Sequence, residues 1–284
     1  MVLCTLQLFS HNAWAKAWSS NGKPDSIVVY KEIDGQSLEL HVFYPSTQKP
    51  APAIAFFHGG GFKKGEPKAF HYACDYFAHR GMVAISVQYR LASGKDRLKC
   101  LMDAKSAIRY IKKNADKLRI DPEMIVSAGG SAGGCLAAAM ATSRIINEKT
   151  DDLSITIDPV ALVLFNPVGV GGSYSKGPWE ESINNDFWPG RSICDNMPPT
   201  LAMWGGKDKF VSVKAMKEFQ QKIRGKGGRC EIEIYPNEEH SFFDNTMEQV
   251  VNTLGRADTF LASMGILKGE PMVGKWAASV KKSP

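Results

Sequence analysis

The chain has 284 residues, 44% of them hydrophobic and 23% charged, which is an ordinary globular composition for one large α/β domain with a buried core. Its formal net charge of +6 comes from lysines and arginines scattered along the sequence, so we expect no nucleic-acid partner. No stretch of about 18 apolar residues predicts a membrane span, and the 6 cysteines form no C-x-x-C pair, so we expect no metal site.

Residues 1–25 precede the first strand pattern. Val2 to Phe9 is mildly apolar, and Ala13-Trp14-Ala15 is similar to a small-residue cleavage site, although no positive charge comes before it. We interpret 1–25 either as a signal segment, in which case the protein is exported, or as an N-terminal tail. Export is favoured over a cytoplasmic location.

The strand patterns begin with a hairpin. Ser26–Glu32 and Ser37–Tyr44 alternate apolar and polar residues around Asp34-Gly35, which predicts two antiparallel strands. Short apolar runs follow, and they are typical of strands buried on both faces of a parallel sheet. These runs are Ala53–Phe57, Met82–Val87, Met124–Ala128, Ala161–Phe165, Thr200–Trp204 and Glu231–Tyr235.

Helical stretches separate the apolar runs. We predict helices near 67–80, 101–117, 133–147, 212–224 and 246–264, which would serve as crossovers on both faces of the sheet. The pattern predicts a single α/β domain over 26–270, with a mostly parallel sheet of about eight strands, and a C-terminal tail over 271–284. The last predicted helix is apolar enough to pack either in the core or in a homodimer, and both remain open.

Residues 167–199 interrupt this alternation of strands and helices. Glycines and prolines break the regularity, while the segment supplies Tyr174, Trp179, Phe187 and Trp188. A connection this long inside a compact domain is usually functional or disordered, and the aromatic residues favour an ordered insertion near the active site.

A nucleophile motif lies between a predicted strand and a predicted helix. Residues 129–133 read Gly-Gly-Ser-Ala-Gly, which matches G-x-S-x-G directly after Met124–Ala128. In such an elbow the chain turns so sharply that the serine backbone is strained, and only small neighbours avoid clashes. The motif in this context predicts Ser131 as a nucleophile.

A serine nucleophile requires a histidine base that is oriented by a carboxylate, and both should follow later strands. Asp208 comes after Thr200–Trp204, and His240 comes after Glu231–Tyr235, where open α/β sheets place their sites. Three other acidic residues are too near His240 in sequence to arrive from a separate strand end: Glu238, Glu239 and Asp244. We therefore predict a triad of Ser131, Asp208 and His240.

Three glycines in the stretch His58-Gly-Gly-Gly-Phe62 follow the predicted strand Ala53–Phe57. Attack on an ester carbonyl places negative charge on oxygen, and bare backbone N–H groups can approach and stabilise it. We expect the N–H groups of Gly60, Gly61 and Ala132 to form this oxyanion hole.

With these motifs the chain resembles the α/β-hydrolase fold and, more narrowly, the HGGG carboxylesterases of the hormone-sensitive-lipase-like group. The matching pieces are HGGGF at 58–62, QYRLA at 88–92, GGSAGG at 129–134, GGKDKFV at 205–211 and EEHSFF at 238–243. It is also similar to bacterial acetyl-esterase or lipase-like proteins over AKSAIRYIKKNADKLRIDPEMIV at 104–126.

The chain departs from the usual pattern of this group at two places. Gln88 stands where an aspartate is common, and the region ahead of the first strand is shorter than the usual helical cap. The resemblance then implies a reduced cap and an open cleft, suited to short acyl groups or to an ester on a sugar. Phe62, Trp179, Phe187 and Trp188 are the candidate lining.

The sequence therefore predicts a serine carboxylesterase of short-chain acyl, acetyl-like esters that needs no cofactor, with a small-molecule or sugar-linked ester as substrate. The same machinery would serve a peptidase or amidase, or a polysaccharide deacetylase, because fold does not fix function. A non-catalytic binding protein on this fold would be expected to lack a triad member, and none is missing here.

Two cysteines are open to two interpretations. Cys74 lies on the predicted helix after the glycine loop, and Cys100 lies just before the next one. In an exported protein the two could form a disulfide, and otherwise both are buried thiols.

Overall fold

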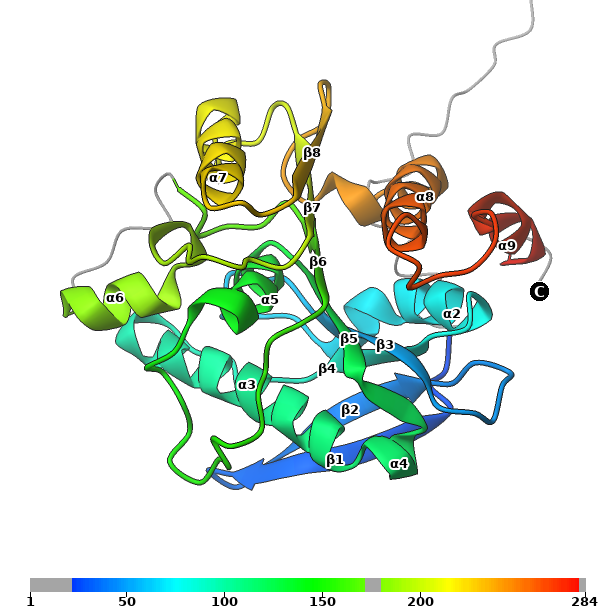
Figure 1. Ribbon diagram of the computed structural model, residues 1–284, viewed down its shortest axis with the longest axis horizontal. Coiled ribbons are helices and arrows are strands. Elements are labelled where there is room, and N and C mark those ends of the chain that lie inside the picture. The colour runs from blue at the N-terminus through cyan, green and yellow to red at the C-terminus, as the bar shows by residue number, and fades with distance from the viewer. Residues whose placement is uncertain (1–21, 172–179, 281–284) are drawn as a thin grey trace, which may run out of the picture.

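The computed structural model describes residues 22–171 and 180–280, and one mixed β-sheet runs through this part of the chain (Figure 1). In chain order the strands are β1 (Ser26–Ile33), β2 (Gln36–Phe43), β3 (Ala51–Phe57), β4 (Val83–Val87), β5 (Ile120–Gly130), β6 (Ala161–Phe165), β7 (Thr200–Gly205) and β8 (Cys230–Tyr235). They lie in the order β1-β2-β4-β3-β5-β6-β7-β8. β1 and β2 pair antiparallel with each other, as does β2 with β4, and all later pairs are parallel.

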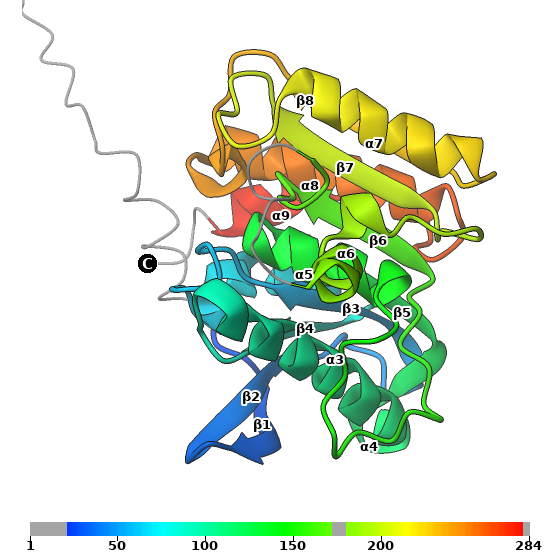
Figure 2. The same cartoon turned by 90° about the vertical axis from the view of Figure 1, so that its left-hand side faces the viewer.

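Helices cover both faces of this sheet. In chain order they are α2 (His71–His79), α3 (Leu98–Lys113), α4 (Ala115–Leu118), α5 (Ala132–Thr142), α6 (Glu181–Phe187), α7 (Val213–Gly225), α8 (Met247–Ala262) and α9 (Val273–Val280). Figure 2 looks onto the face covered by α3, α5, α6 and α7, and α2, α8 and α9 lie behind the sheet. The strands feed both cores because side chains alternate: Ala55 and Phe57 join the first cluster, and Ile54 and Phe56 join the second.

The predicted α/β-hydrolase architecture is confirmed. The hairpin and the six later strands form where the sequence predicts them, within a few residues at each end. Two helices differ from the prediction. The stretch predicted at 101–117 forms α3 and then the short α4, separated at Asn114, and the stretch predicted at 133–147 ends as α5 at Thr142.

A carboxylate from the insertion explains why α5 ends early. Asp186, in α6, accepts hydrogen bonds from the Ser143 hydroxyl at 2.5 Å and from the backbone N–H groups of Arg144, Ile145 and Ile146 at 2.6–3.1 Å. These N–H groups point at Asp186 instead of continuing the helix. The contact fixes the described part of the insertion against the end of α5.

Residues 271–284 were expected to be a tail, and the structure corrects this. Val273–Val280 forms α9, whose Trp276 is 4% exposed and donates from Nε1 to the Asp75 carboxylate at 2.7 Å. Its ring also packs edge-on against Tyr76 at 5.3 Å. The domain therefore continues past residue 270. The sequence did not reveal this because both anchors lie on α2, far away in the chain.

The interpretation of Cys74 and Cys100 as buried thiols is the one that fits. Both are free and fully buried, Cys74 in the core on the α2 side of the sheet and Cys100 in the core on the α3 side. The sheet separates them, so no disulfide joins them. The segment 1–25, predicted as a signal segment or a tail, lies outside the described residues up to position 21. In the part that is described, every helix is too short or too polar to span a membrane.

Candidate active site

Ser131 lies on a strained turn between β5 and α5. Its backbone angles are φ 53° and ψ −114°, which an L-residue adopts only when its surroundings impose them. The turn is fixed by hydrogen bonds from Ser131 N–H to the Phe165 carbonyl at 2.8 Å and from Val168 N–H to the Ser131 carbonyl at 3.2 Å. A Cβ on Gly133 would lie 1.9 Å from the Phe57 carbonyl oxygen, so only glycine allows α5 to start this close to β3.

The structure brings the three predicted triad side chains together. The Ser131 hydroxyl oxygen lies 2.8 Å from Nε2 of His240, and Nδ1 of the same ring lies 2.7 Å from Oδ2 of Asp208. The residues come from the carboxyl ends of β5, β7 and β8, which lie at one edge of the sheet because these strands are parallel. The His240 side chain is 14% exposed and that of Asp208 is 0% exposed.

Asp208 is held ionised by its hydrogen bonds. Burial by itself raises the pKa of this carboxyl, but the hydrogen bond and charge of His240, with two backbone N–H groups, leave the pKa below its ordinary value. Those N–H groups belong to Phe210 and Val211 and donate to Oδ1 at 2.7 and 3.1 Å. Oδ2 is thereby left to face His240.

The glycine loop adopts backbone angles that favour glycine. Gly60 has φ 112° and Gly61 has φ 64°, and a Cβ on Gly60 would lie 1.9 Å from the Lys64 carbonyl oxygen. The loop lies against Ser131, because a Cβ on Gly59 would be 3.4 Å from the Ser131 Cβ. Among the described residues, no acceptor pairs with the N–H groups of Gly60, Gly61 or Ala132. They can therefore donate to an oxyanion.

His58 contacts a residue of the loop that follows β4 and so holds the glycine loop in place. Its ring stacks on Tyr89 at 4.2 Å, and the Tyr89 hydroxyl donates to the His58 carbonyl at 2.7 Å. Burial lowers the pKa of His58 to about 4, so the ring is neutral near pH 7.

Solved structures of one esterase are similar to this chain over most of its length. The apo form of Thermogutta terrifontis esterase 2 is 34% identical, with a TM-score of 0.78 over 86% of this chain and 96% of that chain. Its propionate-bound form is 32% identical, with a TM-score of 0.80 over 88% of this chain and 98% of that chain. The chain belongs to the α/β-hydrolase carboxylesterases.

Further matches support the hormone-sensitive-lipase-like group of this family. The BD-FAE family model matches residues 40–159, and the dienelactone hydrolase family model matches 192–268. Lipase 2 of Moraxella sp. is 30% identical over 152 residues, which are 49% of this chain and 35% of that protein. Esterase LipC of Mycobacterium tuberculosis is 25% identical over 228 residues, 69% of this chain and 54% of that protein. The matches thus span about half the length of these curated relatives, or less.

The predicted aromatic lining is wrong for the residues that can be placed. Phe62, Phe187 and Trp188 are fully buried and contact one another, with ring centroids 4.7–6.2 Å apart. They join the core beneath α3 and α5 and have no accessible surface for a substrate. Trp179 lies outside the described residues.

Two residues near the triad were missed at the sequence level. Asn166, the first residue after β6, donates to Asp208 at 3.2 Å. Phe210 packs edge-on against the His240 ring at 4.7 Å and is 42% exposed. Phe210 lies within the matching piece GGKDKFV, two residues after Asp208, whereas Asn166 belongs to no matching piece and only its position after a strand could have indicated it.

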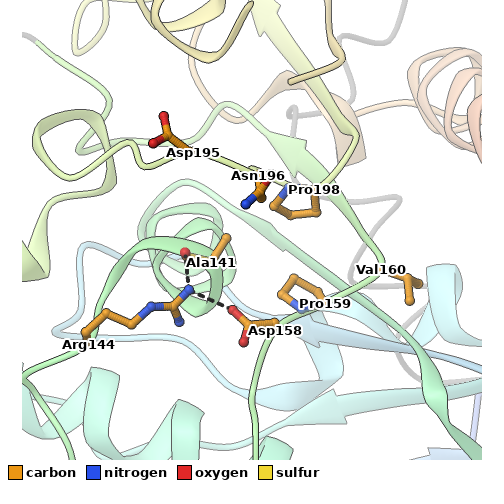
Figure 3. Close-up of a pocket in the computed structure, with 8 residues that line it drawn as sticks. All are labelled: Ala141, Arg144, Asp158, Pro159, Val160, Asp195, Asn196 and Pro198. Atoms are coloured by element: carbon orange, nitrogen blue, oxygen red, sulfur yellow. Dashed lines mark hydrogen bonds and ion pairs between the residues drawn. The ribbon is translucent and has the colours of Figure 1, made fainter. Parts of the chain in front are cut away.

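A separate cavity of about 400 Å³ lies at the opposite end of the sheet (Figure 3). It is bordered by residues that precede β6 and β7 and by Arg144, which pairs with Asp158 at 2.8 Å. Both partners of this ion pair are more than half exposed, and no nucleophile lines the cavity. Nowhere in residues 22–171 and 180–280 do three or more potential ligands gather to hold a metal ion.

Proposed function

We propose that the protein is a serine carboxylesterase of short-chain acyl esters, with Ser131 as nucleophile, His240 as base and Asp208 as the residue that orients His240. The observation that carries the proposal is the unbroken line of hydrogen bonds from Ser131 Oγ through both nitrogens of His240 to Asp208. A serine hydroxyl is a weak nucleophile without such a base, and this arrangement supplies one.

The geometry supports an acyl-enzyme mechanism. Nε2 of His240 takes the proton as Ser131 Oγ bonds to the ester carbon, and the carbonyl oxygen becomes an oxyanion. The N–H groups of Gly60, Gly61 and Ala132 stabilise it, each by about 3 kcal/mol. His240 then returns the proton to the leaving alcohol as the carbon–oxygen bond breaks. Water, deprotonated by His240, releases the acid and restores Ser131.

The similar esterase structures support a short acyl group. Thermogutta terrifontis esterase 2 has been solved with propionate and with butyrate bound, and this chain matches both forms at 32% identity. An ester carried on a sugar remains compatible with this site.

The decisive experiment is hydrolysis of p-nitrophenyl esters from acetyl to long-chain by the wild type and by Ser131→Ala. We expect turnover of the short esters and a loss of several orders of magnitude in kcat for the variant, because its nucleophile is gone. Circular dichroism and the unfolding midpoint are the control that tests whether the variant is folded. A parallel screen of aminoacyl amides separates an esterase from an amidase.

Two results would count against the proposal. A folded wild type that hydrolyses none of the esters would contradict it, as would a Ser131→Ala protein that remains fully active. Paraoxon offers a check that does not depend on choosing the right ester, since Thermogutta terrifontis esterase 2 is phosphorylated by it. We expect mass spectrometry to find the wild type modified at Ser131 and the variant unmodified.

A further inference from the structure

Asn166 contacts the acid of the triad from the neighbouring strand end. It follows β6 directly, and its N–H donates to the Met203 carbonyl of β7 at 2.8 Å. Its side-chain Nδ2 donates to Oδ2 of Asp208 at 3.2 Å. This oxygen also accepts the hydrogen bond from His240 Nδ1. Asn166 and His240 therefore share one oxygen of Asp208.

Two local features of Asn166 are uncommon. Its backbone has φ 44°, in the left-handed region, which few residues other than glycine and asparagine adopt. Its side chain is fully buried, and among the described residues nothing donates a hydrogen bond to Oδ1. A buried carbonyl oxygen without a donor destabilises the folded state. Such features are typical of functional sites, where the surrounding structure imposes them.

The contact completes the hydrogen bonding of Asp208. Oδ1 accepts hydrogen bonds from the N–H groups of Phe210 and Val211, and Oδ2 accepts from His240 and Asn166. The amide of Asn166 restrains Oδ2 from the β6 side, so that the oxygen stays opposite His240 Nδ1. Buried polar groups with all their partners in place hold a single geometry.

We propose that Asn166 is a positioning residue of the triad, which holds Oδ2 of Asp208 against His240 through its side-chain amide. This inference rests on the proposed function. An amide suits the position better than a carboxylate, because a second negative charge at this distance from Asp208 would repel it and favour a protonated His240. The isosteric Asn166→Asp variant is therefore expected to disturb catalysis despite its equal size.

The first test compares kcat and KM for p-nitrophenyl acetate in Asn166→Gly and the wild type. Glycine tolerates the left-handed backbone, so this variant removes the amide without adding backbone strain. We expect kcat to fall by about 10- to 100-fold, the usual effect of a misplaced catalytic group, with KM little changed. Ser127→Ala is the matched control, since it removes a buried β5 hydroxyl for which the described part of the chain offers no hydrogen-bond partner.

The second test measures the titration of His240 by NMR in Asn166→Asp, with signals assigned from a His240→Gln variant. We expect the added carboxylate to favour the protonated imidazole, so that the NMR titration curve and the acidic limb of kcat/KM both lie at higher pH in the variant than in the wild type. Ser127→Ala should leave the titration unchanged. This readout does not depend on turnover, so it tests Asn166 even if the ester assay shows no activity and the proposed function fails.

Three outcomes would overturn the inference. In the first, Asn166→Gly retains the kcat of the wild type. In the second, Ser127→Ala loses as much kcat as Asn166→Gly, which would indicate general loosening of the core. In the third, Asn166→Asp leaves the titration of His240 where the wild type has it. If Asn166→Gly does not fold, the Asn166→Asp titration decides alone.

Discussion

Asp208 and Asp244 follow the last two strands of the sheet, and their environments give the two carboxyl groups opposite properties. Asp208 follows β7 and accepts hydrogen bonds from His240, from Asn166 and from two backbone N–H groups. Asp244 lies four residues beyond His240, and only its own backbone N–H stabilises its charged form. Burial raises the pKa of Asp244 to about 6, whereas the pKa of Asp208 stays below its ordinary value.

The difference shows that desolvation alone does not decide the charge of a carboxyl group. Burial raises the pKa of both groups, and the donors that surround a carboxylate decide whether it stays charged. Asp208 obtains its donors because it leaves the sheet at a strand end of its own, opposite His240. Asp244 sits on the short helical turn Phe242–Asp244, in the same loop as the histidine. Substitutions at the two aspartates test this contrast.

The largest effect is expected for Asp208→Asn. Loss of the carboxylate leaves His240 in the wrong tautomer, and in a Ser-His-Asp triad this lowers kcat by about 10⁴. The measurement is kcat for p-nitrophenyl acetate in Asp208→Asn and Asp244→Asn, with circular dichroism to confirm the fold. Asp244→Asn should keep a kcat close to that of the wild type, because within the described residues no hydrogen bond joins the Asp244 side chain to Ser131, Asp208 or His240. If the two variants exchanged these results, Asp244 would be the acid and the contrast would be reversed.

The triad and the fold were predictable because backbone geometry restricts the sequence around them. Ser131 requires small neighbours in its turn, and Asp208 and His240 follow strands whose apolar runs are visible in the sequence. The same rule excluded Asp244, since a residue in the loop of His240 cannot come from a separate strand end. Here local sequence and global fold agree.

Other features depend on partners that are distant in the chain, so the sequence could not indicate them. An aromatic residue in the sequence can line a pocket or fill a core. Phe187 and Trp188 fill the core, as their contacts with Phe62 in the structure show. α5 ends at Thr142 because of Asp186, which is more than 40 residues later. Asn166 belongs to no sequence motif. Its contact with Asp208 arises because β6 and β7 are neighbours in the sheet and end side by side.

A smaller effect, on stability, is expected for Asp244→Asn. A carboxyl group whose pKa is raised on folding contributes most to the stability of the folded protein below its unfolded pKa of about 3.9, where it is protonated. This contribution is lost as the pH rises through the folded pKa of about 6. The difference between these two pKa values lowers the free energy of unfolding by about 3 kcal/mol at pH 8 relative to low pH, at about 1.4 kcal/mol for each pKa unit. We therefore expect urea unfolding at pH 8 to find Asp244→Asn more stable than the wild type. If the wild type and Asp244→Asn were equally stable at pH 8, a hydrogen-bond donor or solvent would be stabilising the charged form of Asp244.

The smallest effect concerns Asp208 and has the opposite dependence on pH. Because the folded pKa of Asp208 is lowered, its charged form stabilises the fold above the unfolded pKa of about 3.9, and this stability is lost as the pH falls through the folded pKa. The free energy of unfolding of the wild type should therefore exceed that of Asp208→Asn near pH 7, and the gap should narrow below about pH 4. Urea unfolding of both proteins between pH 3 and pH 7 measures it. If the difference in free energy of unfolding between the two proteins stayed constant over this range, the charge of Asp208 would not be what stabilises the loop after β7. The two aspartates would then differ in their packing and not in their ionisation.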